Sequence, residues 1–323
     1  MTSSTYIADL TFEGYLQEIR TKYPRLYELL DPERIEADAI EDYLKELNTL
    51  SWEFEDQDTG GRGQAWSQAQ NSSNSRRVGM VSLLERFSRD TPGPDLRVLD
   101  VLGGSGTVAR LAATLGNDAP TVFTADISNL MISSCRAGEL PYIRQSAARS
   151  LFRDDSLDGV LIGYGTQLLS PEVRQLAVAE SYRTLKPGAR LVVHAFEAGE
   201  GAARFFDDVV HPYSRTGHPH KHLTREEISN LFADAGFPEV EIHDMNDPFI
   251  LEAQTAEEAK RNALMHLYRA YDLCKISGSQ QDIEASLEPL VEETLGPISV
   301  RREQEHYIAE VPRTALAAVG VKA

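Results

Sequence analysis

The N-terminal part of the chain has the apolar spacing of amphipathic helices. Apolar residues recur at intervals of three and four between Tyr15 and Leu29, and again between Ile35 and Leu47. This spacing places them on one face of a helix, and such a face must be covered by other elements. We therefore predict that residues 1–88 form a helical extension that packs over the main domain.

A different pattern begins near residue 95. Short runs rich in Val, Ile and Leu alternate with amphipathic segments such as Val173–Leu185. The runs are typical of buried parallel strands, and their alternation with helices predicts right-handed crossovers in a doubly wound α/β sheet. The predicted strands lie within residues 96–102, 121–127, 157–165 and 189–196.

The C-terminal part combines helical and strand patterns. Two helical patterns, near residues 255–277 and 281–294, form a predicted helical insert at about 251–300. An apolar run typical of a last β-strand then closes the chain. We place this insert within one main domain that spans residues 89–323.

The strongest chemical signal is a glycine-rich turn after the first predicted strand. The strand ends at Asp100, and Gly103, Gly104 and Gly106 precede a helix that begins near Thr107. Glycines permit a tight turn and a close approach of a ligand, while the helix directs its unpaired N–H groups into the same crevice. Because the Gly-Ser-Gly-Thr-Val-Ala segment also fits a dinucleotide-binding pattern, an NAD-dependent oxidoreductase is one alternative.

The turn resembles the first motif of the class I S-adenosylmethionine-dependent methyltransferases. That motif is an acidic residue followed by G-x-G-x-G. Asp100 takes the acidic position, while Gly104 and Gly106 match the second and third glycines. Leu102 stands at the first glycine position, and Gly103 supplies flexibility one residue later.

Three later segments extend this resemblance. Asp126 ends the second strand, where the family's acidic residue holds the ribose hydroxyls, and Ile127 takes the position that packs on the adenine. Residues 145–165 resemble the family's G-D-A-x-x-L-P-F-x-D-x-S-F-D-x-V run, with Ser146 in place of the Asp that meets the adenine amino group. Residues 184–193 match the turn into the fifth strand.

The resemblance covers about residues 95–245. It implies S-adenosylmethionine as the cofactor and a seven-stranded, mostly parallel, Rossmann-like sheet. The cofactor-binding residues that it implies are Asp100, Leu102, Gly103, Gly104, Gly106, Asp126, Ile127, Ser146, Ala147 and Gly163.

The implied activity is methyl transfer to a small-molecule acceptor, through an oxygen, nitrogen or carbon nucleophile, in secondary metabolism. The relatives that it most resembles are the ubiquinone/menaquinone-type and natural-product methyltransferases. A cofactor-binding enzyme that catalyses a cyclisation or rearrangement is a second alternative. A non-catalytic interaction protein is a third.

Candidate catalytic residues follow the fourth strand and the fifth. Tyr164 follows the fourth strand, and His218, His220 and His222 share one face if their segment is extended. Imidazoles can serve as a base near neutral pH or bind a transition metal. We select these four residues as catalytic candidates and assign no metal; a solvated loop and a divalent-metal site are the alternatives.

Charge narrows the possible partners. The chain has 50 acidic and 32 basic residues, a formal charge of −18, which on average repels nucleic acids and anionic membranes.

Neither a signal peptide nor a long apolar segment is present, so we expect a cytoplasmic protein. The helical extension suggests a homodimer. We expect Arg76 and Arg77, just before the core, at the surface; the alternative is an approach to the cofactor carboxylate, as in related enzymes.

Overall fold

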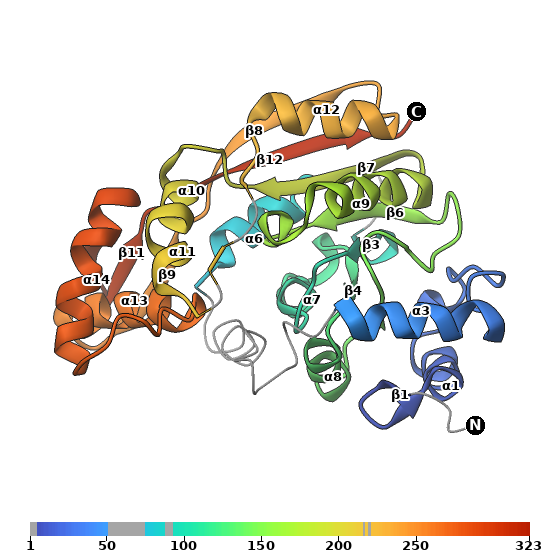
Figure 1. Ribbon diagram of the computed structural model, residues 1–323, viewed down its shortest axis with the longest axis horizontal. Helices are drawn as coiled ribbons and strands as arrows, with labels where there is room; N and C mark the ends of the chain where they lie inside the picture. The colour runs from blue at the N-terminus through green and yellow to red at the C-terminus, as the bar shows by residue number, and fades with distance from the viewer. Residues whose placement is uncertain (1–4, 51–74, 88–92, 216, 219–220) are drawn as a thin grey trace.

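A seven-stranded sheet forms the centre of the computed structural model, which describes residues 5–50, 75–87, 93–215, 217–218 and 221–323 (Figure 1). The strand order is β5-β4-β3-β6-β7-β12-β8. Neighbours from β5 to β7 are parallel, whereas β12 runs antiparallel to both β7 and β8. The predicted doubly wound, mostly parallel sheet is therefore confirmed.

Each predicted strand is present in this sheet. The strand predicted at 189–196 is β7, which begins at Leu185, four residues before the predicted start. The strands are β3 (Arg97–Asp100), β4 (Thr121–Asp126), β5 (Tyr142–Arg144), β6 (Leu157–Ile162), β7 (Leu185–Ala195), β8 (Val240–Asn246) and β12 (Thr314–Val321).

Helices cover both faces of the sheet because neighbouring strand residues point to opposite sides. Val98 belongs to the core that contains α6 and α7, whereas Leu99 belongs to the core that contains α8, α9 and α12. A capping box of Thr224 and Glu227 starts α12. The helices are α6 (Arg77–Leu84), α7 (Thr107–Thr114), α8 (Asn129–Ala137), α9 (Pro171–Thr184), α10 (Gly201–Phe205), α11 (His211–Tyr213) and α12 (Arg225–Ala235).

The N-terminal extension packs at the β5 edge of the sheet. It contains β1 (Thr5–Ile7), β2 (Leu10–Thr11), α1 (Phe12–Lys22), α2 (Pro24–Tyr27) and α3 (Ala37–Leu50). The Tyr15 hydroxyl donates a 2.8 Å hydrogen bond to the carbonyl of Tyr142 in β5. The first apolar stripe is divided at Pro24, which cannot continue α1 and instead begins α2.

The insert before the last strand contains a sheet as well as the predicted helices. Its elements are β9 (Phe249–Ala253), α13 (Ala256–Ala270), α14 (Gln280–Thr294), β10 (Ser299–Glu303) and β11 (His306–Val311). The strands form an antiparallel sheet in the order β10-β11-β9. The apolar run expected to be one last strand is therefore two strands, β11 and β12, in different sheets.

Three short 3-10 helices and one π-helix, η4 (Phe206–Val210), complete the regular elements described. The 3-10 helices are η1 (Gly93–Asp95), η2 (Gly116–Asp118) and η3 (Thr166–Leu168). Among the helices that the structure describes, none combines the length and apolar character that a bilayer span requires.

Candidate active site

The glycine-rich turn between β3 and α7 has no room for larger side chains. A Cβ on Gly103 would lie 2.6 Å from Thr124 Cγ2, and a Cβ on Gly106 would lie 2.5 Å from Leu140 Cδ1. Gly106, the N-cap of α7, also has a φ of 83°, which L-residues rarely adopt. Packing against Thr124 and Leu140 thus requires glycine at both positions and fixes the path of the turn at the carboxyl end of the sheet.

Leu102 replaces the family's first glycine without blocking the turn. Its side chain fits against Gly165, which follows β6: a Cβ on Gly165 would lie only 2.7 Å from Leu102 Cδ1. The next residue, Gly103, donates a 2.9 Å hydrogen bond to the carbonyl of Ala125 in β4. The leucine at the first glycine position is therefore accommodated by Gly165, in the segment that follows the neighbouring strand.

Asp100 is a buried carboxylate with no hydrogen-bond partner among the described residues. Its residue is 1% exposed, and neither carboxylate oxygen accepts a hydrogen bond. Burial raises the pKa of Asp100 to about 8, and the nearby charge of Asp126 adds to this effect. Two neighbouring carboxylates favour a cationic ligand group and disfavour the pyrophosphate of a dinucleotide.

Asp126 is held in place by the glycine turn. Its Oδ2 accepts a 2.9 Å hydrogen bond from the Gly104 N–H, and its Oδ1 accepts one of 2.9 Å from the Ser128 N–H. Each carboxylate oxygen can accept a further hydrogen bond. The arrangement suits the two hydroxyls of a ribose.

The predicted adenine-side residues lie beside Asp126. Ile127 and Ala147 are half-buried, and the Ser146 N–H donates a 2.8 Å hydrogen bond to the hydroxyl of Tyr43 in α3. Gly163 is buried at the end of β6. The N-terminal extension thus supports the loop that contains Ser146. The predicted cofactor residues lie at or just after the carboxyl ends of β3, β4, β5 and β6.

The titration of Asp100 leads to a testable prediction. Because its pKa is about 8 in the ligand-free protein, the carboxyl group is mostly protonated at pH 7. A cationic ligand favours the ionised form, so binding releases up to one proton, and affinity rises with pH until about 8. Calorimetric titration with S-adenosylmethionine at pH 7, in phosphate and in Tris, measures this release. Asp100→Asn should abolish the buffer dependence; an equal dependence in both proteins would contradict the assignment.

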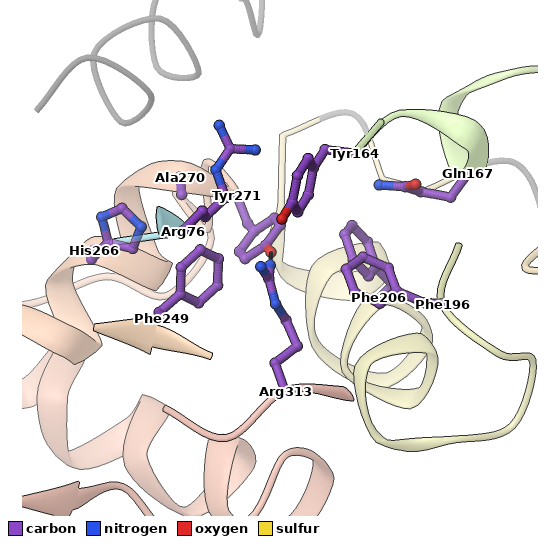
Figure 2. Close-up of a pocket in the computed structure, with 10 residues that line it drawn as sticks. All are labelled: Arg76, Tyr164, Gln167, Phe196, Phe206, Phe249, His266, Ala270, Tyr271 and Arg313. Atoms are coloured by element: carbon purple, nitrogen blue, oxygen red, sulfur yellow. Dashed lines mark hydrogen bonds between the residues drawn. The ribbon is translucent and has the colours of Figure 1, made fainter. Parts of the chain in front are cut away.

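A pocket lies beside this crevice, at the carboxyl ends of β6 and β7. Figure 2 shows its aromatic rings and arginine side chains converging from the core, the α10 region and the insert. The lining residues are Arg76, Tyr164, Gln167, Phe196, Phe206, Phe249, His266, Ala270, Tyr271 and Arg313.

A buried network around Asp247 supports the pocket. Asp247 follows β8, is fully buried, and lies 2.6 Å from Arg313 Nη2. Its Oδ1 accepts a 2.9 Å hydrogen bond from the Tyr164 hydroxyl, and its Oδ2 lies 3.3 Å from His194 Nε2. Burial opposes ionisation, but the Arg313 charge and these hydrogen bonds lower the pKa of Asp247.

Tyr164 is fixed in an unusual conformation. Its φ is 56°, which a bulky residue rarely adopts, and such strain is found mainly at functional sites. Its ring lies 4.3 Å from the ring of His194. Burial and the Asp247 charge raise the pKa of Tyr164 well above its usual value. Tyr164 therefore keeps its proton at neutral pH and donates it to Asp247 in a hydrogen bond, and its catalytic role stays a prediction.

Arg76 lines the pocket, so the surface position expected for it is wrong. Its guanidinium lies 4.6 Å from the centre of the Tyr164 ring, and no described residue forms an ion pair with it. Burial lowers its pKa. The Arg76 charge partly offsets the rise in the pKa of Asp100 that burial causes. The pocket and the glycine turn are therefore connected electrostatically. Arg77, by contrast, is exposed as expected.

The histidine segment is arranged differently from the prediction. His218 and His222 lie close to Asp207, which the sequence did not single out, and neither histidine lines the pocket with Tyr164. His220 lies outside the described residues. Burial lowers the pKa of His222 to about 3, and the neighbouring His218 and Arg174 contribute. A catalytic role for these histidines stays a prediction.

Sequence reasoning missed most of the pocket. Asp247, Arg313, His194 and the phenylalanines come from β7, β8, the insert and the α10 region, and no local motif marks them. Of the residues that line the pocket, the sequence pointed to Tyr164, which follows the fourth strand, and to Arg76, which lies just before the core.

Comparisons with known proteins match the core of the chain. Residues 99–193 match the family model described as a methyltransferase domain. A demethylmenaquinone methyltransferase from Beutenbergia cavernae is 37% identical over 123 residues, which cover 37% of this chain and 49% of the relative. A ubiquinone/menaquinone biosynthesis C-methyltransferase from Klebsiella pneumoniae is 26% identical over 195 residues, covering 52% of this chain and 77% of the relative.

A solved structure shares the fold. It is phosphoethanolamine N-methyltransferase 2 from Haemonchus contortus in complex with S-adenosyl-L-methionine, with a TM-score of 0.52 and 18% identity. The alignment covers 82% of this chain and 57% of that one. The first curated relative is matched over about half of its length.

Proposed function

We propose that this chain, whose core belongs to the class I S-adenosylmethionine-dependent methyltransferases, methylates a planar small molecule that carries an acidic group. The observation that carries the proposal is the pocket beside the glycine turn. It combines aromatic walls with Arg76, a cation that has no ion-pair partner among the described residues.

The cofactor half of the site fits S-adenosylmethionine. Asp126 would hold the ribose hydroxyls, Ile127 and the segment at Ser146 and Ala147 would flank the adenine, and Asp100 would lie near the cationic methionine part. When bound, the cofactor supplies a methyl group activated by its sulfonium.

The other half of the site would position the acceptor. Phe196, Phe206, Phe249 and Tyr271 offer faces and edges on which a planar body can pack while water is excluded. Arg76 offers a planar, bidentate donor for a carboxylate, enolate or phenolate. Burial, with the charges of Arg76 and Arg313, lowers the pKa of His266 to about 4, so this imidazole can accept a hydrogen bond from the acceptor at neutral pH. Correct positioning supplies much of the rate in such a transfer.

A panel of acceptors tests the proposal. Planar aromatic acids and keto acids are each compared with their methyl ester or amide, and S-adenosylhomocysteine release is measured. We expect turnover of one or more acids and a KM at least about tenfold higher for the neutral partner, because a charge-assisted hydrogen bond contributes about 1.5–3 kcal/mol. Equal turnover of acids and neutral analogues would contradict the proposal. Product formation without S-adenosylhomocysteine would instead indicate the cyclisation or rearrangement alternative.

Arg76→Gln tests whether Arg76 binds an acidic group of the acceptor or the carboxylate of the cofactor. We expect it to raise the KM for the acid at least about tenfold. In titrations at pH 9, where Asp100 is ionised and its link to Arg76 matters little, we expect the cofactor affinity to stay within about twofold. Arg77→Gln, at the exposed neighbouring position, is the matched control and should change neither. A loss of cofactor affinity in Arg76→Gln would place this arginine on the methionine carboxylate and remove the argument for an acidic acceptor.

A cytoplasmic location, a homodimer and a role in secondary metabolism stay predictions.

A further inference from the structure

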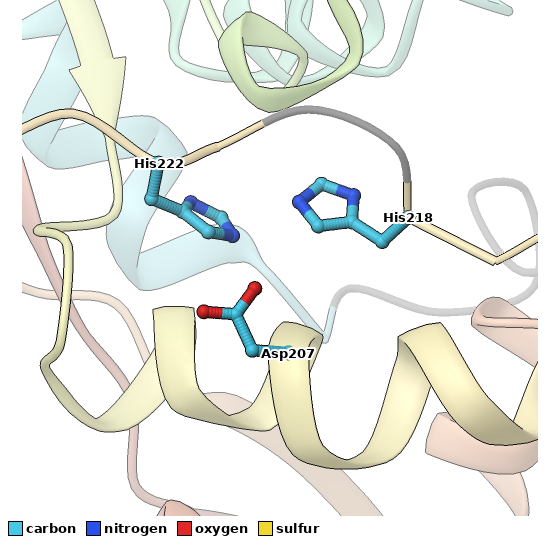
Figure 3. Close-up of side chains that lie close together, drawn as sticks. All are labelled: Asp207, His218 and His222. Carbon is cyan, nitrogen blue, oxygen red and sulfur yellow. The ribbon is translucent and has the colours of Figure 1, made fainter.

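A cluster of metal-binding side chains lies behind one wall of the pocket. The donor atoms of Asp207, His218 and His222 lie within 4.8 Å of one another, and Figure 3 shows the three side chains converging from a helix and from the loop above it. Asp207 belongs to the helix after β7, whereas the two histidines precede α12. None of the three belongs to the cofactor site or lines the pocket described above.

His222 has an unsatisfied polar atom directed into this cluster. The residue is 7% exposed, and its Nε2 has no hydrogen-bond partner among the described residues. In Figure 3 its ring points toward Asp207 and His218. A buried polar atom without a partner is costly, so its presence calls for a ligand.

The helix that carries Asp207 has an uncommon geometry at this point. Residues Phe206–Val210 form a π-helix between α10 and α11. Such turns are rare and occur frequently at functional sites. Here the π-helix carries both Asp207 of the cluster and Phe206, which lines the pocket.

We propose that Asp207, His218 and His222 together bind one divalent transition-metal ion. Two imidazoles and one carboxylate suit Zn²⁺ and its neighbours such as Co²⁺ or Fe²⁺, whereas Ca²⁺ and Mg²⁺ prefer oxygen donors. With metal–ligand bonds of about 2.0–2.2 Å, donor atoms lie about 3–3.5 Å apart, so separations that now reach up to 4.8 Å shorten by at most about 1.5 Å on binding. Asp207 is exposed, and rotation of its side chain can supply much of this movement.

The ion would fix the wall of the pocket. The Phe206 ring lies 4.9 Å from the ring of His218 and 5.2 Å from that of His222. A metal held by Asp207 and both histidines ties the loop before α12 to the helix that carries Phe206. The inference does not depend on the proposed acceptor, because metal binding is measured without any substrate.

Zn²⁺ titration of the full-length chain tests this inference. The protein carries no histidine tag, is treated with a chelator and is titrated by calorimetry, while Co²⁺ absorption reports the ligand set. We expect one ion per chain, and at least about tenfold weaker binding in His222→Gln and in Asp207→Asn. Asp207→Asn alters an exposed residue, so it tests the site even if His222→Gln folds poorly.

His243→Gln is the matched control. His243 is a half-buried histidine 3.2 Å from the exposed Glu241, and this pair lacks the third donor of the proposed site. We expect it to bind Zn²⁺ within about twofold of the unaltered chain. The inference is overturned if the unaltered chain binds no Zn²⁺ or Co²⁺, if Asp207→Asn binds as tightly as the unaltered chain, or if only His243→Gln weakens binding.

Discussion

Replacing Asp247 with asparagine should lower the free energy of unfolding by about 3–5 kcal/mol. The side chains of Asp247 and Arg313 are 0% and 3% exposed, and they lie 2.6 Å apart. The substitution leaves the Arg313 charge buried without a counter-charge, and a buried charge that has lost its partner is strongly destabilising. Tyr164 and His194 also lose the carboxylate to which they are connected.

Urea unfolding of the two proteins, followed by circular dichroism, measures this change. Glu310→Gln is the matched control, because Glu310 pairs at 3.1 Å with Arg301, which is 51% exposed. A surface pair of this kind contributes about 0–1 kcal/mol. Equal losses of stability in Asp247→Asn and Glu310→Gln would contradict the role of the buried Asp247–Arg313 pair in supporting the pocket.

Asp126→Ala should weaken binding of S-adenosylmethionine and of S-adenosylhomocysteine at least about tenfold, or about 1.4 kcal/mol. The carboxylate is already aligned by the N–H groups of Gly104 and Ser128, so it can meet two hydroxyls without further ordering. The substitution also releases the Gly104 N–H and so loosens the turn on which the cofactor is expected to lie.

Calorimetric titration measures both affinities. Asp118→Ala, on the exposed η2 turn near the other end of α7, removes a carboxylate without touching the crevice and should leave the dissociation constants within about twofold. An unchanged dissociation constant in Asp126→Ala would mean that the ribose is held elsewhere.

The sheet was predictable because its signal is local. Buried parallel strands such as β3 and β6 are continuous apolar runs, and the helices between them have their own periodicity. The small sheet of the insert was missed because β11 pairs with β9, more than 50 residues earlier, and because β11 and β12 are separated only by Pro312 and Arg313. Their separation into two sheets depends on tertiary pairing rather than on either strand's composition.

The two halves of the site differ in the same way. The cofactor half lies within a short segment from Asp100 to Gly106 and at the end of the next strand, so its motif can be read from the sequence. The pocket is built from Arg76, Asp247 and Arg313, which only the topology brings together. The prediction placed the three histidines on one face of an extended segment. In the structure, His218 and His222 lie close to Asp207, which belongs to a helix. The prediction of a methyltransferase core is confirmed over residues 99–193, which match the model of a methyltransferase domain.

The most direct test of the central claim is calorimetric titration of the purified chain with S-adenosylmethionine, S-adenosylhomocysteine and NADH in separate experiments. Asp100 and Asp126 at the glycine turn favour the cationic cofactor over a pyrophosphate. We expect both adenosyl sulfur compounds to bind and NADH not to bind. Binding of NADH alone, or of none of the three, would contradict the account.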